Sequence, residues 1–240
     1  MALGTSTYET LHKRLEQLYS DWSECTRCSL SEFREEIGNG ILTGNGLSGE
    51  EEYRQRVMFV IDRLDPSEII NGEFQTGHHG KILGELLQRL GVDLDDVWST
   101  PTCLCPTQVY DPEDWRTPEL AKPANGKQMR ACRPRLMREI HIVQPLVVVA
   151  MGANAYEAVM GKHKARYKFS THMGQTVPAI IQGDLIEYTV PTIPTHSPNR
   201  LLRNMDMSKE SLWHHTYKHV GTALRLAEKY LDASFGIYSE

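Results

Sequence analysis

The 240-residue sequence contains no long apolar run, because its longest apolar stretch, 145–151, is much shorter than the roughly 20 residues that a membrane-spanning helix needs. Residues 1–17 already include Glu, His, Lys and Arg, so they lack the apolar segment of a signal peptide. The composition is not that of a disordered chain either, since 40% of the residues are hydrophobic and 24% are charged. We therefore expect one globular domain over residues 1–240, located in the cytoplasm and without membrane association.

The chain also lacks an excess of positive charge and contains little cysteine. Its 26 Lys and Arg residues face 31 Asp and Glu residues, and the net charge of −5 argues against indiscriminate nucleic-acid binding while leaving room for one basic face. The clearest local basic run contains Lys162, Lys164, Arg166 and Lys168. Five cysteines are too few for a secreted disulfide framework in a chain of this length, so a reducing compartment is expected.

Short apolar runs rich in β-branched residues alternate with amphipathic segments along the chain, and these predict strands and helices respectively. Strands are predicted over 57–61, 97–100, 146–150, 180–186 and 188–193. Helices are predicted over 8–23, 81–90, 128–143, 155–160 and 209–231. The alternation indicates an α/β fold with a mostly parallel sheet covered on both faces, in which ligands bind beyond the carboxyl ends of the strands.

The positions of the cysteines permit one metal site. Cys25 and Cys28 form a Cys-x-x-Cys pair, whereas Cys105 follows the second predicted strand and Cys132 begins the next helix. All four could meet at one end of the sheet, where four thiolates would suit zinc or an iron–sulfur cluster. Ordinary buried thiols would show the same spacing, so both interpretations stay open. Cys103 is left over and is interpreted as a core residue.

Several motifs occur in an order that resembles a known family. They are Cys-x-x-Cys-x-Leu at 25–30, Thr100 with Cys105, Ala-Cys-Arg-Pro-Arg-Leu at 131–136, the apolar run ending in Gly at 145–152, and Pro-Thr-His-Ser-Pro-Asn-Arg-Leu-Leu-Arg at 194–203. Over residues 8–230 this order resembles the iron–sulfur branch, family 4, of the uracil-DNA glycosylase superfamily. The resemblance implies a three-layer αβα fold with a central, mostly parallel four-stranded sheet. It also implies a DNA glycosylase that acts as a monomer on duplex DNA with a flipped base.

The resemblance further implies a [4Fe–4S] cluster bound by Cys25, Cys28, Cys105 and Cys132. The cluster would have a structural rather than a redox role. An insertion at 111–126 makes the spacer between Cys105 and Cys132 longer than is usual in the family.

Cleavage of the bond between a base and its sugar develops positive charge on the sugar and negative charge on the departing base. A carboxylate near the sugar would stabilise the cation and orient water. Asp65-Pro66 follows the first predicted strand, where the family carries a catalytic loop, and it is closer to the Gln-Asp-Pro-Tyr pattern of a sister branch than to the Gly-Glu-Ala-Pro-Gly of family 4. Asp65 is therefore the candidate for the water-positioning carboxylate, with Asp62 as the alternative. A simple Asp-Pro turn at Asp65 also stays open.

The residues expected around the base depart from the family pattern. Ser67 is small where the sister branch has an aromatic residue that excludes pyrimidines substituted at carbon 5. Pro101 stands where relatives place an Asn that reads the uracil edge, and proline offers neither an amide side chain nor an N–H. Gln75 falls at the position of the aromatic residue that stacks on the flipped base. The neighbouring Phe74 either stacks in its place or belongs to the core.

A second catalytic loop is expected at Thr-His-Ser-Pro, 195–198, where either His196 or Ser197 faces the base. The following Leu201 and Leu202 suit a wedge that fills the space of the extruded base, and Arg200 and Arg203 suit phosphate contacts. The remaining candidates for substrate contact are His78, His79 and Asn199.

These departures favour a DNA glycosylase that excises a modified, 5-substituted pyrimidine and leaves an abasic site. Glucosylated hydroxymethylcytosine in phage DNA is an example by analogy, which would suit a role in antiviral defence. Two alternatives are kept: removal of uracil in base-excision repair, and a catalytically silent member of the fold that only binds DNA.

Overall fold

A computed structural model describes residues 5–37, 40–46, 57–107, 123–161, 168–183, 187–204, 208 and 210–236. Most of the insertion at 111–126 lies outside the described residues, and so do Lys162, Lys164 and Arg166 of the predicted basic run. Lys168, the last residue of that run, is described and exposed.

The described residues form a five-stranded sheet in the order β2-β1-β3-β5-β4. Its strands are β1 (Val57–Ile61), β2 (Trp98–Pro101), β3 (Val147–Met151), β4 (Val177–Gln182) and β5 (Glu187–Thr195). The pairs β1–β2, β1–β3 and β3–β5 are parallel, whereas β4 pairs antiparallel with β5 at one edge. The mostly parallel sheet is confirmed, but it has five strands where the family resemblance implied four. The connection between the end of β4 at Gln182 and the start of β5 at Glu187 is short, and such connections join antiparallel neighbours. β4 is therefore an antiparallel edge strand next to the parallel ones.

Helices connect and cover these strands. They are α1 (Thr5–Ser23), α2 (Leu30–Ile37), α3 (Pro66–Asn71), α4 (His78–Gln88), the 3-10 helix η1 (Leu94–Asp96), α5 (Gly126–Val143), α6 (Ala153–Met160), α7 (Phe169–His172), α8 (Pro198–Leu202) and α9 (Leu212–Gly236). The five predicted helices correspond to α1, α4, α5, α6 and α9. The sequence did not predict α2, α3, α7 and α8, which are short, and two of these begin at a proline.

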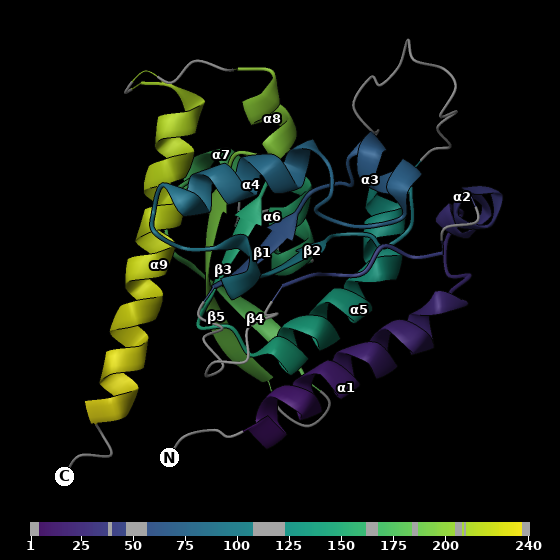
Figure 1. The fold of residues 1–240 in the computed structure, drawn as a ribbon, viewed down its shortest axis with the longest axis horizontal. Coiled ribbons are helices and arrows are strands. Elements are labelled where there is room, and N and C mark those ends of the chain that lie inside the picture. The colour runs from purple at the N-terminus through teal and green to yellow at the C-terminus, as the bar shows by residue number, and fades with distance from the viewer. Residues whose placement is uncertain are drawn as a thin grey trace.

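Alternate residues of β1 point to opposite faces of the sheet, and the whole strand is buried. Met58 and Val60 pack in an apolar cluster with α1, α5 and α6, while Phe59 and Ile61 pack in a second cluster with α4 and α9. The sheet is therefore the middle of three layers. Figure 1 shows α1 running beside α5, with α9 along another side of the molecule.

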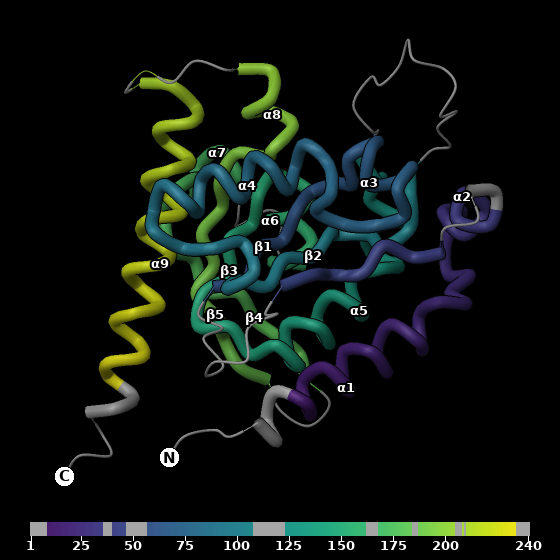
Figure 2. Tube along the Cα trace, in the orientation of Figure 1, coloured from purple at the N-terminus to yellow at the C-terminus, as the bar shows by residue number. Residues whose placement is uncertain are grey.

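The short helix α8 follows β5 and packs against α4. The chain trace in Figure 2 shows α8 close to α4, although β2, β3, β4 and β5 separate them in sequence. Within the described residues, every helix is too short or too polar to cross a membrane.

Candidate active site

The loops that follow the parallel strands are held together by backbone hydrogen bonds. The N–H of Asp62, after β1, donates to the carbonyl oxygen of Met151 at 3.2 Å. The N–H of Gly152, after β3, donates to Thr195 at 2.9 Å, and the N–H of Thr102, after β2, donates to Ile61 at 2.9 Å. The carboxyl ends of the strands thus form one edge, and the predicted catalytic residues lie there.

Asp65 caps the N-terminus of α3. Its Oδ1 accepts hydrogen bonds from the backbone N–H of Ser67 at 2.9 Å and from the Ser67 hydroxyl, and its own N–H donates to Glu68 Oε2 at 2.6 Å. This reciprocal pair is a capping box, in which each side chain satisfies a backbone donor that the helix leaves free. Burial alone would raise the pKa of Asp65, but the bonds from Ser67 and the nearby His79 and His78 lower it on balance. Asp65 is therefore a carboxylate at neutral pH.

His79 joins three separate segments of the chain. Its side chain is 2% exposed, and its Nε2 lies 2.9 Å from Oδ1 of Asn199 on α8 and 3.8 Å from Oδ2 of Asp65. The neighbouring His78 approaches Asp65 Oδ1 at 3.5 Å, but its side chain is 59% exposed. Buried His79 is thus a structural partner of the carboxylate, whereas His78 is open to a ligand.

Asp62, the alternative carboxylate, lies in different surroundings. It is 3% exposed and pairs with Arg63 at 3.2 Å, and its Oδ1 has no hydrogen-bond partner among the described residues. Burial raises the pKa of Asp62 despite the nearby Arg63. Gly152 has φ +105, and a Cβ built there would lie 2.7 Å from Asp62 Oδ2, so only glycine allows this close approach. The pKa is thus shifted upward at Asp62 and downward at Asp65, so Asp65 is the better anion.

His196 and Ser197 follow β5 and have different roles in the structure. Ser197 caps α8, where its hydroxyl oxygen accepts the N–H of Arg200 at 3.4 Å. His196 is 5% exposed, and its Nδ1 has no hydrogen-bond partner among the described residues. Burial and the positive charge of Arg200 lower the pKa of His196 to about 4, so the ring is neutral at pH 7 and carries one N–H donor.

The predicted base-contacting residues Gln75, Pro101 and Phe74 make contacts within the protein. Gln75 adopts a left-handed backbone with φ +70, and its side-chain amide donates to the Ser99 hydroxyl of β2. Pro101 is buried at the end of β2. Phe74 is 3% exposed and packs in the core cluster that contains β1 and α4.

The predicted DNA-contacting residues of α8 divide by exposure. Leu201 is fully buried, so of the two leucines only the partly buried Leu202 is open to a duplex. Arg200 and Arg203 are exposed. The arginines are therefore available to phosphate groups, whereas Leu201 anchors α8 in the core.

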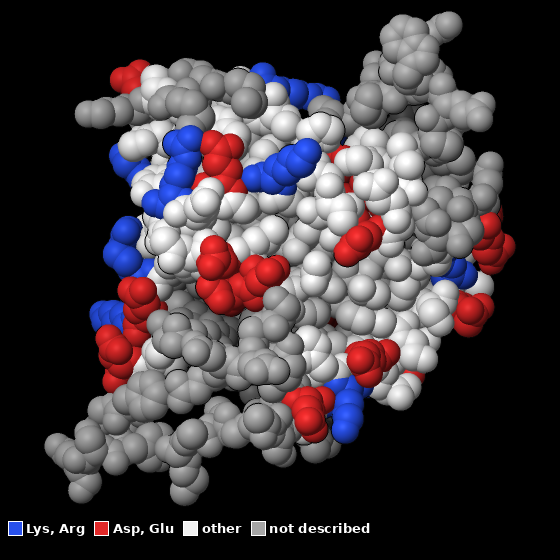
Figure 3. Space-filling model, viewed as in Figure 1, with Lys and Arg blue, Asp and Glu red and all other residues white. Residues whose placement is uncertain are grey.

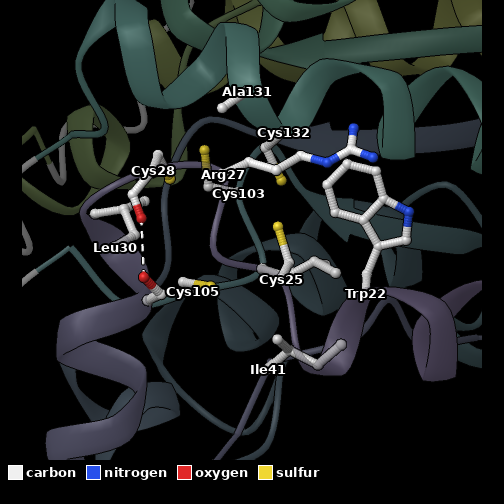
Figure 4. A pocket seen from close by; sticks show the side chains of 12 residues that line it. Trp22, Cys25, Arg27, Cys28, Leu30, Ile41, Cys103, Cys105, Ala131 and Cys132 are labelled. Carbon is white, nitrogen blue, oxygen red and sulfur yellow. Dashed lines mark hydrogen bonds between the residues drawn. The ribbon is translucent and has the colours of Figure 1, made fainter.

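The cysteines line one pocket, drawn in Figure 4. Cys25 and Cys28 come from the segment between α1 and α2, Cys105 from the loop after β2, and Cys132 from α5. Cys103 is a buried core residue, as predicted, and it also lines this pocket. Within the described residues, no three His, Cys, Asp or Glu side chains stand close enough to hold a metal ion as they lie.

The donor set of this pocket nevertheless fits a soft metal centre, because all of its candidate ligands are thiols. A hydrogen bond from Cys103 and the nearby Arg135 guanidinium outweigh the effect of burial and lower the pKa of Cys132 to about 5. This shift favours the thiolate of Cys132, the form in which cysteine binds a metal. Burial and the neighbouring Cys132 raise the pKa of Cys105 to about 12.

The chain is similar to known proteins over most of its length. Residues 49–220 match the uracil DNA glycosylase superfamily. A type-4 uracil-DNA glycosylase from Pyrobaculum aerophilum is 29% identical over 192 residues, which cover 79% of this chain and 85% of that protein. Proteins of the same name from Sulfurisphaera tokodaii and Thermotoga maritima are 26% and 28% identical, covering 81% and 75% of this chain and 79% of each relative.

These matches define the class of protein as a DNA glycosylase, a hydrolase that cleaves the bond between a base and deoxyribose, with DNA as its substrate. The chain belongs to the uracil-DNA glycosylase superfamily. The names of its relatives also confirm the resemblance to the family 4 branch.

Proposed function

We propose that the protein excises uracil from DNA by directing water at the sugar carbon, with Asp65 as the carboxylate that orients the water. One observation carries the assignment of Asp65. Asp65 is a buried, ionised carboxylate that follows the carboxyl end of β1 and lies beside His79 and His78. Its Oδ2 accepts none of the hydrogen bonds that cap α3.

The charges of the site support this chemistry. An anion at Asp65 would stabilise the positive charge that develops on the sugar, and it would accept a proton from the attacking water. A neutral His196 would donate its N–H to an oxygen of the departing base, where negative charge develops. A neutral imidazole suits this role, because it donates without having to transfer its proton.

Uracil is the first candidate for the base because the relatives are named type-4 uracil-DNA glycosylases. A 5-substituted pyrimidine is the second candidate, and Ser67 and Pro101 favour it. Ser67 is small and turned toward Asp65, and the backbone nitrogen of Pro101 carries no hydrogen to read the base. Removal of glucosylated hydroxymethylcytosine from phage DNA would be one form of this second activity.

A base-release assay across matched duplexes separates these candidates. The duplexes carry uracil, 5-hydroxymethylcytosine or its glucosylated form, with unmodified cytosine and thymine as controls. We expect alkali-labile abasic sites in the uracil duplex. Abasic sites only in the modified-cytosine duplexes would establish the second candidate. Binding without strand scission on any duplex would show a silent DNA-binding protein.

Asp65→Asn tests the role of the carboxylate. Asparagine is also a good N-cap, so the variant keeps α3 and loses only the negative charge. We expect the single-turnover excision rate to fall by about 100-fold or more with unchanged affinity for DNA. The exposed Asp95→Asn serves as the matched control. A wild-type rate in Asp65→Asn would transfer the role to Asp62, for which Asp62→Asn is the next variant.

We also propose that Cys25, Cys28, Cys105 and Cys132 hold a [4Fe–4S] cluster. The common pocket of the four residues and their thiol chemistry support it. Such a cluster would tie α5 to the loop after β2 and to the N-terminal segment, so its role would be to stabilise the fold.

The metal content of the purified protein tests this assignment. We expect a brown protein that contains iron and acid-labile sulfide, and we expect Cys132→Ser to lose both. Cys103→Ser is the matched control because Cys103 lies in the same pocket, and it should keep the iron. A colourless protein that contains only zinc would overturn the cluster.

A further inference from the structure

Arg135 of α5 is fully buried and binds the end of β2. Its Nη2 donates to the carbonyl oxygens of Pro101 at 2.7 Å and Thr102 at 2.9 Å. Its Nη1 donates to the Thr100 hydroxyl at 3.0 Å and pairs with the Glu139 carboxylate. A single guanidinium therefore binds three consecutive residues, the last two of β2 and the first of the loop that leaves the sheet.

That loop is bonded directly to the candidate active site. The Thr102 hydroxyl donates to the carbonyl oxygen of Asp62 at 3.0 Å, and the Thr102 N–H donates to Ile61 at 2.9 Å. Arg135 and Asp62 are thus connected through one residue. Any shift of the backbone at Thr102 would be passed to the end of β1, where the catalytic loop begins.

The same guanidinium lies next to the cysteine pocket. Nη2 of Arg135 is 3.8 Å from Sγ of Cys132, which lies one helical turn earlier on α5. Cys103 and Cys105, which follow Thr102 in the chain, line the pocket together with Cys132. Arg135 therefore lies between the thiols and the sheet edge.

Stability is a weak reason for burying this charge. A buried ion pair must overcome the cost of removing both charges from water, and apolar residues of similar volume often replace such a pair without loss. A guanidinium does something that an apolar residue cannot, because its planar fork can bind two carbonyl oxygens at once in a fixed geometry. Arg135 uses this geometry, because its Nη2 binds the two carbonyl oxygens while its Nη1 binds Thr100 and Glu139.

We propose that Arg135 is a positioning residue for the glycosylase reaction, which fixes the Pro101–Thr102 backbone beside Asp62 and connects it to the cysteine pocket. The catalytic consequence rests on the proposed function. The fixed backbone would form one wall of the space that receives the flipped base, so Arg135 would act through residues 100–102 without touching the substrate.

The test uses a variant that removes the charge and leaves few buried groups unpaired. Glu139 also accepts hydrogen bonds from Trp98 and Tyr19, so it is changed to Gln, which keeps an acceptor for them. The double variant Arg135→Met/Glu139→Gln is compared with Glu139→Gln alone. Arg138→Met, at a half-exposed position on the same helix, is the control for a change of Arg to Met.

Two readouts are measured on the full-length protein. Hydrogen–deuterium exchange of the backbone at 98–106 reports the position of the loop, and single-turnover base release with a separate measurement of DNA affinity reports the reaction. We expect faster exchange at 98–106 and a loss of about tenfold to 100-fold in the excision rate with unchanged affinity for DNA. Arg138→Met should resemble the wild type. Glu139→Gln alone should lose less than the double variant, because it keeps the guanidinium but leaves its buried charge without a counter-ion. Arg135→Lys should be intermediate because lysine lacks the fork.

Unchanged exchange and an unchanged rate in the folded double variant would overturn the proposal, as would an equal loss in Glu139→Gln alone. If the double variant does not fold, Arg135→Lys gives the same two readouts. If the wild-type protein releases no base, the proposed function fails, and the exchange measurement by itself decides whether Arg135 holds the loop.

Discussion

At the level of single residues, the Glu68 side chain connects the two ends of the α3 segment by hydrogen bonds. Its Oε2 accepts the N–H of Asp65 at 2.6 Å and its Oε1 accepts the N–H of Gln75 at 2.9 Å, and it is fully buried. Burial raises the pKa of Glu68 to about 8, against the opposing effect of these two donors. At neutral pH a large share of Glu68 is therefore protonated in the folded protein, whereas it would be ionised in the unfolded chain.

This raised pKa makes the contribution of Glu68 to stability depend on pH. The contribution is fully present below the unfolded value of 4.5 and is lost as the pH rises toward about 8, because the folded state holds the proton more tightly than the unfolded chain does. We expect Glu68→Gln to remove this decrease in the free energy of unfolding with rising pH, since an amide does not titrate. Urea unfolding at pH 5, 6, 7 and 8 measures it as the difference between variant and wild type. The exposed Glu73→Gln is the control, and parallel pH curves for Glu68→Gln and the wild type would contradict the prediction.

At the level of secondary-structure elements, the α3–α4 connection is packed tightly against Asp65, the proposed catalytic carboxylate. Gly77 caps α4, and a Cβ built there would lie 2.5 Å from Ser67 Oγ and 2.8 Å from Asp65 Oδ1. The backbone angle φ of −96° at Gly77 suits any residue, so space alone requires glycine here. The first turn of α4 can then bring His78 and His79 to Asp65.

Gly77→Ala should push α4 away from Asp65. We expect a loss of about 1–3 kcal/mol in the free energy of unfolding and a strong decrease in excision rate. Gly84→Ala on the same helix is the matched control, because its Cβ would meet only Leu94 at 3.9 Å. Alanine is the better helix former, so the control should be stabilised by up to about 1 kcal/mol and keep its activity. Equal activity of the two variants would show that the close approach at Gly77 is not required.

At the level of the whole molecule, the net charge of −5 must be reconciled with a polyanionic substrate. Figure 3 shows acidic and basic side chains interspersed on one face, with Lys and Arg side chains at the end of the molecule where α8 lies. Exposed Arg200 and Arg203 belong to this end. A local group of cations next to the site can hold the DNA backbone without an overall positive charge, because salt screens charges that are more than about 10 Å away.

Arg200→Ala/Arg203→Ala should therefore weaken DNA binding in a salt-dependent way. Each phosphate contact adds about 0.9 to the slope of log affinity against log salt, so we expect the slope to fall by about 1 for each arginine removed. Fluorescence anisotropy over a series of salt concentrations measures it. Arg14→Ala on α1, which Figure 1 shows on the opposite side from α8, should leave the slope unchanged. An unchanged slope in the double variant would place the DNA elsewhere.

Part of the site could be predicted because its signals are local. The loop after β1 followed from a strand with no polar residue, and Asp65 became a candidate because Asp65-Pro66 resembles a motif of the family. Glu68 was missed, although the spacing of Asp65 and Glu68 is that of a capping box and could have revealed both α3 and the buried carboxyl group. The contact between His79 and Asn199, which are 120 residues apart, has no local signal.

The sequence by itself determined the α/β alternation, the family and the set of chemical groups, because periodicity and motif order are properties of neighbouring residues. Tertiary structure alone decided which groups meet and what charge each carries. It placed Cys103 among the other thiols, brought Arg135 to the end of β2 and added β4 to the sheet. It also kept Asp65 an anion despite its burial and made Glu68 largely a neutral acid, since the pKa of a carboxyl group depends on burial and on neighbours supplied by distant parts of the chain.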